Sequence, residues 1–212
     1  FGELALILVI VLIIFGAGAI GSVVGGFLAK AGHDVTLLGR PWHLDIVRRD
    51  GLRITGLWGD HRIRHLAVAT APEQVQHASA FEWILLCVKA HQTAGAAEVI
   101  GGWLGPSTLV CALQNGLGNY ETLCARMPRD RVALGRVIFG VEIEPGQVRV
   151  TVCADDVRLG APDAGFPQER LEALAAERNI SLWEIVTGHW SLVTGHFNHG
   201  TQNKLRLFAD IV

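Results

Sequence analysis

Short apolar runs alternate with segments of helical periodicity along most of the chain. The runs that predict buried strands are the one ending at Phe15 and residues 33–40, 52–55, 62–69, 83–88, 108–113 and 180–186. The segments that predict helices are residues 19–31, 44–50, 73–77, 92–104, 120–126 and 168–178. Strands that alternate with helices favour a parallel sheet with helices on its faces. The pattern therefore predicts an α/β fold of the Rossmann type, with a doubly wound parallel sheet.

A Pro- and Gly-rich stretch, A-P-D-A-G-F-P at residues 161–167, is typical of a domain boundary. We expect a dinucleotide-binding domain over residues 1–165 and an incomplete, truncated helical second domain over residues 166–212. Residues 187–212 lack a clean apolar period, and residues 1–9 are more apolar than one strand requires. Both end segments raise the question of whether they are native in-frame sequence.

The motif G-A-G-A-I-G, from Gly16 to Gly21, follows the first apolar run and precedes a predicted helix. In a G-x-G-x-x-G turn the first glycine allows the tight turn, and the second lets a pyrophosphate approach the backbone. The third lets the helix pack closely on the strand. The free N–H groups and positive dipole end of the helix would then face the phosphates.

The same region has an alternative interpretation as a membrane helix. No charged side chain occurs from Leu4 to Ala29, which is long enough to span a bilayer, and Gly21 with Gly25 forms a small-xxx-small pair. Five glycines from Gly16 to Gly26 would weaken such a helix, and no signal-peptide features are present. We expect no membrane partner.

The second predicted strand ends in Gly39 and Arg40, roughly 20 residues beyond the glycine turn. Sites selective for NAD place an acidic side chain there to bind the ribose 2′-hydroxyl. The guanidinium of Arg40 instead suits a 2′-phosphate, so the sequence favours NADP(H). The alternative is a solvated arginine in the turn before Pro41.

Lys89 and Asn115 follow two buried strand-like runs, at the strand ends where ligands of open α/β sheets bind. A lysine can meet a phosphate or carboxylate, and an asparagine can donate and accept hydrogen bonds to a nicotinamide, a ribose or a substrate hydroxyl. Taken singly, each is more often a turn residue than a ligand.

Composition excludes some classes of function. The 212-residue chain has a net charge of -2 and a pI near 6.5, so it has no basic field to recruit nucleic acid. Hydrophobic residues make up 50% of the chain, as expected when strands are buried on both faces. The four cysteines lack C-x-x-C spacing and are expected to be reduced, as in a cytoplasmic enzyme. His189, His196 and His199 fit no standard metal spacing, so we expect no metal site.

Six segments together resemble the ketopantoate reductases (2-dehydropantoate 2-reductases), over roughly residues 10–165. In chain order, they are G-A-G-A-I-G from Gly16, H-D-V-T-L-L-G-R ending at Arg40, D-G-L-R-I-T from Asp50, V-K-A-H-Q-T from Val88, Q-N-G-L-G-N from Gln114 and E-P-G-Q-V from Glu144. The V-K-A and Q-N-G-x-G combination is much more specific than the glycine turn.

The resemblance implies a two-domain enzyme that uses NADPH to reduce the ketone of 2-dehydropantoate to pantoate, in the biosynthesis of pantothenate and coenzyme A. The glycine turn would hold the pyrophosphate and Arg40 the 2′-phosphate; Lys89 would lie near cofactor and substrate, and Asn115 would contact both. The candidate cofactor-binding residues are Gly16, Ala17, Gly18, Ala19, Ile20, Gly21, Arg40, Lys89 and Asn115, of which Lys89 and Asn115 are also candidate substrate-binding residues.

The proton donor has no clear counterpart in this sequence. The family supplies it as a lysine in a W-x-K-L-x-x-N pattern, whereas the segment from Trp190 has Leu192 at the lysine position and His196 at the asparagine position. A second register from Trp183 also lacks the lysine, and Lys204 would be an arbitrary choice. We therefore assign no catalytic residue.

Three hypotheses follow for the function. In the first, the chain is an NADPH-dependent reductase of 2-dehydropantoate or of a similar small 2-keto acid. In the second, it is an NADP-binding Rossmann module with impaired catalysis, and in the third, it is a membrane-anchored protein. The sequence carries no signature of oligomeric state and is compatible with a homodimer.

Overall fold

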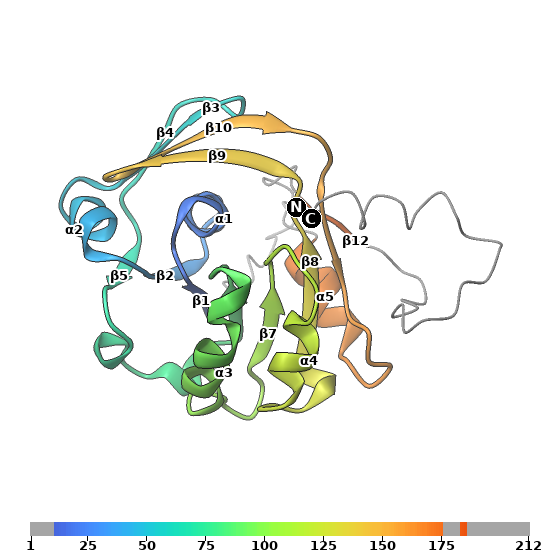
Figure 1. Cartoon of the computed structure of the whole chain (residues 1–212). Helices are drawn as coiled ribbons and strands as arrows, with labels where there is room; N and C mark the ends of the chain where they lie inside the picture. Colours follow the sequence, from blue (N-terminus) through green and yellow to red (C-terminus); the bar gives the residue numbers. More distant parts are fainter. Residues whose placement is uncertain (1–10, 176–182, 186–212) are drawn as a thin grey trace, which may run out of the picture.

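An eight-stranded sheet forms the centre of the protein in the computed structural model, which describes residues 11–175 and 183–185 (Figure 1). In spatial order its strands are β12 (Trp183–Ile185), β11 (Val157–Gly160), β8 (Val132–Arg136), β7 (Leu109–Ala112), β6 (Trp83–Leu86), β1 (Val11–Phe15), β2 (Asp34–Leu38) and β5 (Ala67–Ala69). All neighbouring strands are parallel except β8 and β11. The predicted Rossmann-type α/β fold is confirmed.

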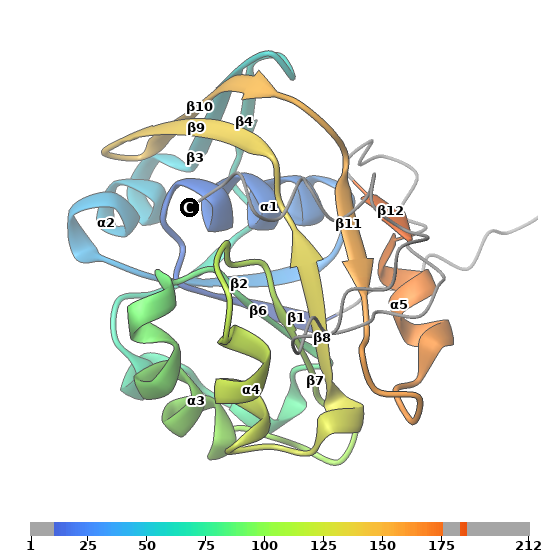
Figure 2. The same cartoon turned by 45° about the vertical axis from the view of Figure 1, so that its right-hand side comes forward.

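Helices cover both faces of this sheet (Figure 2). The α-helices are α1 (Ala19–Lys30), α2 (Pro41–Asp50), α3 (Thr93–Gly101), α4 (Asn119–Cys124) and α5 (Gln168–Ala175). Single 3₁₀ turns are η1 (Pro72–Gln74), η2 (Ala78–Ala80), η3 (Ala90–Gln92) and η4 (Arg129–Arg131). Helices α3 and α4 lie on one face, whereas α1 lies on the other.

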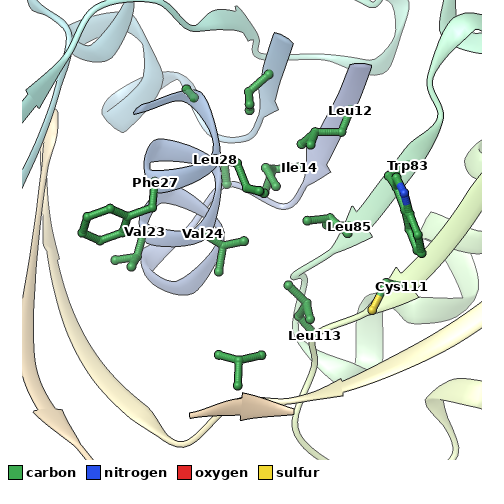
Figure 3. Close-up of a cluster of buried hydrophobic side chains, with 14 of the residues drawn as sticks. Leu12, Ile14, Val23, Val24, Phe27, Leu28, Trp83, Leu85, Cys111 and Leu113 are labelled. Atoms are coloured by element: carbon green, nitrogen blue, oxygen red, sulfur yellow. The ribbon is translucent and has the colours of Figure 1, made fainter. Parts of the chain in front are cut away.

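Strand β1 supplies side chains to the cores on both faces of the sheet. Leu12 and Ile14 belong to the core on the α1 side, and Ile13 belongs to the core on the α3 side. All three side chains are fully buried. Figure 3 shows Ile14 beside Leu28 of α1. Burial on both faces explains why this strand is a continuous apolar run with no alternation of polar residues.

A second, four-stranded sheet was not expected. Its strands, in spatial order, are β4 (His61–Ile63), β3 (Leu52–Gly56), β10 (Gln147–Cys153) and β9 (Phe139–Glu144). The single strand predicted over residues 62–69 is therefore wrong, because β4 pairs with β3 whereas β5 pairs with β2 of the large sheet. Ile63 and Ala69 are both buried, but in the cores of different layers, and the exposed Arg64 and His65 connect them.

The small sheet lies over the outer side of α1 (Figure 1). A Cβ atom on Gly26 of α1 would lie 2.6 Å from Ile54 Cδ1 and 2.9 Å from Leu52 Cδ2, both on β3. With the large sheet beneath it and the small sheet above it, α1 buries nine of its twelve residues. A helix that is enclosed on all sides needs apolar residues around its whole circumference.

This enclosure accounts for the long uncharged segment that also allowed a membrane interpretation. Residues 11–29 form a sheet strand, a turn and a buried helix, so a single spanning helix over residues 4–29 is wrong for the described part of that range. Among residues 11–175 and 183–185, no helix has both the length and the apolar character needed to cross a bilayer.

Two further predictions concern residues 73–77 and the domain boundary. The helix predicted over residues 73–77 is wrong, since only the turn η1 forms before Val75 becomes extended. Beyond residue 165, Leu171 and Leu174 of α5 are fully buried in the core on the α1 side of the large sheet. Most of the predicted second domain, residues 166–212, lies outside the described residues, and the division into domains stays a prediction.

Helix α1 approaches β1 so closely that a methyl group at Gly21 has no room. A Cβ there would lie 2.7 Å from the Gly16 carbonyl oxygen and 2.8 Å from Ile14 Cγ2, whereas a Cβ on Gly95 of α3 would meet nothing within 4 Å. We expect Gly21→Ala to destabilise the protein by about 1–3 kcal/mol. The matched change Gly95→Ala should stabilise it by up to about 1 kcal/mol, because alanine favours helix. Urea unfolding of both variants measures this, and equal effects would contradict the close packing.

Candidate nucleotide-binding site

The carboxyl ends of four parallel strands lie level at one edge of the large sheet. Phe15 of β1 pairs with Leu38 of β2 and with Leu86 of β6, and Leu86 pairs with Ala112 of β7. From β1 the chain continues to β2 on one side and later returns to β6 on the other side. This is a topological switch point, where open α/β sheets bind ligands. Every predicted site residue follows one of these strand ends.

The glycine turn is held directly against the neighbouring strands. The N–H groups of Gly16 and Ala17 both donate to the Leu38 carbonyl oxygen, at 3.0 and 2.8 Å. Gly16 has a φ of +97°, and a Cβ there would lie 2.7 Å from the Val88 backbone nitrogen. The positive φ and the approach of the Val88 backbone both require glycine at this position.

Gly18 is constrained in a different way. It is exposed and forms the N-cap of α1, and a Cβ there would meet nothing of the protein closer than 4.0 Å. No side chain caps α1, and its first turn has no acidic residue. The N–H groups of Ala19, Ile20 and Gly21 have no partners within the helix, as is general for a first turn. Free amides of this kind and the positive end of a helix dipole favour anions, so an anion-binding site with its open side at Gly18 stays the prediction for this turn.

Arg40 lies next to this turn. A Cβ on Gly39 would lie 2.9 Å from the Ala17 carbonyl oxygen, so the chain leaving β2 passes directly beside the glycine turn. Arg40 is exposed at the N-cap of α2, and within the described residues no hydrogen bond or ion pair occupies its guanidinium. Its charge is therefore available to a ligand at the same edge of the sheet.

Lys89 and Asn115 are both exposed, on neighbouring loops after β6 and β7. A Cβ on Gly116 would lie 3.7 Å from Ala90 Cβ, which places the two loops side by side. The loop after β6 also contacts the glycine turn through Val88. The structure thus brings the glycine turn, Arg40, Lys89 and Asn115 to one edge of the sheet, and their roles as ligands stay predictions.

A partly buried chain of hydrogen bonds joins these two loops, and sequence reasoning did not identify it. The Gln114 amide nitrogen donates to the Val88 carbonyl at 2.8 Å and to Thr93 Oγ1 at 2.9 Å. Thr93 then donates to Asn119 Oδ1 at 2.9 Å, and Asn119 Nδ2 donates to the Gly116 carbonyl at 3.2 Å. Polar residues within both motifs, V-K-A-H-Q-T and Q-N-G-L-G-N, were the available signal. These bonds fix the loops that carry Lys89 and Asn115.

His43 of α2 is a second buried polar group that the sequence did not reveal. Its Nε2 hydrogen-bonds with Ser22 Oγ of α1 at 3.0 Å. Its Nδ1 lies 2.9 Å from the Glu144 carbonyl oxygen and accepts from the Gly146 N–H at 3.1 Å. Burial lowers the pKa of His43, although the Glu144 carbonyl acts in the opposite direction. The imidazole is therefore neutral near pH 7.

The remaining candidate chemistry lies away from this edge or outside the described residues. Burial raises the pKa of the Cys87 thiol to about 12, so it stays protonated and unreactive. All four cysteines are free thiols, as expected. Within residues 11–175 and 183–185, no three His, Cys, Asp or Glu side chains group as metal ligands. The residues considered for proton donation or metal binding that lie outside the described part are His189, Leu192, His196, His199 and Lys204.

Comparison with known proteins gives a consistent result. The family model described as "Ketopantoate reductase PanE/ApbA" matches residues 12–164. A 2-dehydropantoate 2-reductase of Halobacterium salinarum is 36% identical over 187 residues, which cover 82% of this chain and 60% of that protein. The chain thus spans about 60% of the length of this relative.

Solved structures show the same fold. A PanE/ApbA family ketopantoate reductase from Ralstonia eutropha is similar with a TM-score of 0.71 and 30% identity, over 84% of this chain and 56% of that one. A D-mandelate dehydrogenase solved with NADH and anilino(oxo)acetate has a TM-score of 0.72 at 23% identity, over 82% of this chain and 56% of that one. The second likeness shows the fold alone.

Because burial lowers the pKa of His43, we expect this residue to make stability depend on pH. The unfolded chain binds the proton more readily than the folded protein, so the free energy of unfolding should fall as the pH drops below about 6.5 and through the lower folded pKa. His43→Gln removes the titrating group and should flatten this decrease. Urea unfolding from pH 7.5 to 5 measures it, and parallel curves for the two proteins would contradict the assignment.

Proposed function

Because the chain belongs to the ketopantoate reductase family, we propose that it binds NADP(H) and forms the nucleotide-binding part of an enzyme that reduces the ketone of 2-dehydropantoate to pantoate. The observation that carries this proposal is the uncapped N-terminus of α1 at the switch point, with the open side of Gly18 before it and Arg40 beside it. The protein residues present therefore fit a phosphorylated dinucleotide.

The diphosphate of the cofactor would bind to the amides of Ala19, Ile20 and Gly21. The open space at Gly18 supports this assignment, because protein packing alone does not require glycine there. Gly16 and Gly21 are needed by the fold itself. A diphosphate can approach the backbone closely only where no side chain is in the way. Glycine at position 18 leaves that space open beside the free amides.

Arg40 supports NADP(H) in preference to NAD(H). The two residues that end this connection, Gly39 and Arg40, include no acidic side chain to accept a hydrogen bond from a ribose 2′-hydroxyl. The planar guanidinium can bind a 2′-phosphate through two parallel hydrogen bonds. The D-mandelate dehydrogenase of similar fold was solved with NADH, so this fold itself does not dictate the cofactor and the residues after β2 would decide it.

Lys89 and Asn115 would contact the nicotinamide end and the substrate. The nicotinamide supplies a hydride when bound, and the protein must orient it toward the ketone. The Lys89 ammonium can bind the carboxylate of a small 2-keto acid, and the Asn115 amide can donate to the ketone oxygen and accept from a ribose hydroxyl. The hydrogen bonds through Gln114 and Thr93 would keep both loops in place.

An NADP-binding module without turnover is the second candidate function. Leu192 in place of the lysine of the W-x-K pattern favours it. We assign no proton donor, and the two candidates differ only in whether a bound keto acid is reduced. A cytoplasmic location is proposed on the free thiols, since reducing compartments keep cysteines unpaired. A homodimer stays a prediction.

Direct assay separates these two candidates. We expect titration with NADPH to quench the tryptophan fluorescence of the chain. When 2-dehydropantoate is then added, we expect NADPH to be oxidised, which its absorbance measures. Binding without oxidation would support the module instead of the reductase. If neither NADPH nor NADH bound at millimolar concentration, the proposed function would be wrong.

Replacement of Arg40 tests which cofactor the site selects. We expect Arg40→Ala to weaken NADPH binding roughly 10- to 100-fold, because one or two charge-assisted hydrogen bonds are lost. NADH binding should change little. Arg49→Ala, which removes an exposed arginine from the last turn of α2, is the matched control and should affect neither cofactor. Equal weakening of both cofactors by Arg40→Ala would show that Arg40 does not bind the 2′-phosphate.

A further inference from the structure

We infer that His43 is a positioning residue for cofactor selectivity, which fixes Arg40 relative to the amides at the start of α1. The inference rests on the proposed function, since it deepens the role of the same site. His43 is 1% exposed and cannot touch a ligand. It acts through three elements that meet at its imidazole, namely α1, α2 and the turn between β9 and β10.

On the α1 side, His43 is bound to the residue that closes the glycine turn. The Ser22 N–H donates to the Gly18 carbonyl at 2.9 Å, and Ser22 Oγ donates to the Ala17 carbonyl at 3.5 Å. Ser22 is fully buried, and its hydroxyl also bonds with His43 Nε2 at 3.0 Å. One side-chain contact therefore connects His43 to the two residues that open the diphosphate site.

On the α2 side, His43 belongs to the helical turn that begins with Arg40. Its own N–H donates to the Arg40 carbonyl at 3.2 Å. Only His43, Leu44 and Val47 of α2 are buried, and the exposed Arg48 at the other end of the helix adds a hydrogen bond of 3.3 Å to the Val68 carbonyl. Of these three, only His43 forms side-chain hydrogen bonds, and these bonds have a preferred direction that apolar contacts lack.

On the third side, the β9–β10 turn fixes the imidazole. The Gly146 N–H donates to His43 Nδ1, and the Glu144 carbonyl lies on the same nitrogen. Gly146 has a φ of +72°, and a Cβ there would overlap the side chain of Ile46 on α2. The turn therefore packs against α2 and also hydrogen-bonds with His43. These two contacts give the E-P-G-Q motif from Glu144 a structural role at the proposed cofactor site.

This arrangement predicts an effect on selectivity and not only on stability. NADH and NADPH would use the same diphosphate site, but only NADPH needs Arg40 at a set distance from it. Loosening the first turn of α2 should therefore weaken NADPH binding and leave NADH binding nearly unchanged. The ratio of the two dissociation constants is a readout that a general loss of stability would not move.

The experiment measures this ratio in the full chain for a series of variants. In His43→Leu the polar contacts of both ring nitrogens are lost, and the ratio that favours NADPH should fall roughly three- to tenfold, in line with one or two hydrogen bonds. In His43→Gln an amide can reach the Nε2 position and restore the bond to Ser22, and the ratio should recover in part. His33→Leu replaces another buried histidine, 4% exposed, beyond the far end of α1, and should leave the ratio unchanged.

Each outcome decides the inference. If folded His43→Leu keeps the wild-type ratio, or if His33→Leu lowers it equally, the inference is wrong. If His43→Leu does not fold, Ser22→Ala removes the same bond from the α1 side, and an unchanged ratio there overturns the inference. If the wild-type protein bound neither nucleotide, the proposed function would be wrong. The variants are therefore compared only after selective binding of NADPH by the wild type has been measured, so that failure of the inference and failure of the proposed function are distinguishable.

Discussion

The close contact between α1 and β1 at the glycine turn is the constraint on which the rest of the structure depends. A Cβ on Gly21 would lie 2.7 Å from the carbonyl oxygen of Gly16, and a Cβ on Gly16 would lie 2.7 Å from the backbone nitrogen of Val88. Backbone here packs directly on backbone. This contact places the start of α1, with its free amides, at the switch point of the sheet, and it leaves Gly18 as the one glycine of the motif with open space before it.

The small sheet extends this arrangement outward. In a fold of only two layers, the outer side of α1 would face solvent. The small sheet covers that side, so α1 is a buried core helix. The same sheet carries the turn that binds His43, so one substructure both completes the apolar core and reaches the helix that begins with Arg40. Stability and the proposed nucleotide selectivity therefore share their contacts.

The polar groups around the site divide into two kinds. Gly18, Arg40, Lys89 and Asn115 are exposed and are candidates for contact with ligand. Others, such as Thr93, are buried and bond only to protein atoms. Buried polar groups must have partners, because unmet hydrogen bonds are costly away from water. A chain of such bonds can therefore hold exposed side chains at fixed positions.

Sequence patterns predicted where exposed polar residues follow the strands, and they did not reveal the buried kind. The position of a residue directly after an apolar strand is visible in the chain, whereas His43 and Thr93 carry no such signal, since their partners are 21 and 26 residues away.

By itself, the sequence determined the α/β class, the positions of the main strands along the chain and the place of the glycine turn, because each follows from local periodicity or from glycine's lack of a side chain. Tertiary structure alone decided that residues 62–69 divide between two sheets, that β3 pairs with the distant β10, and that α1 is enclosed on both sides. It also decided that His43 joins α1, α2 and a distant turn. Such choices depend on which surfaces meet after the chain has folded back on itself, and local sequence does not encode the identity of a distant partner.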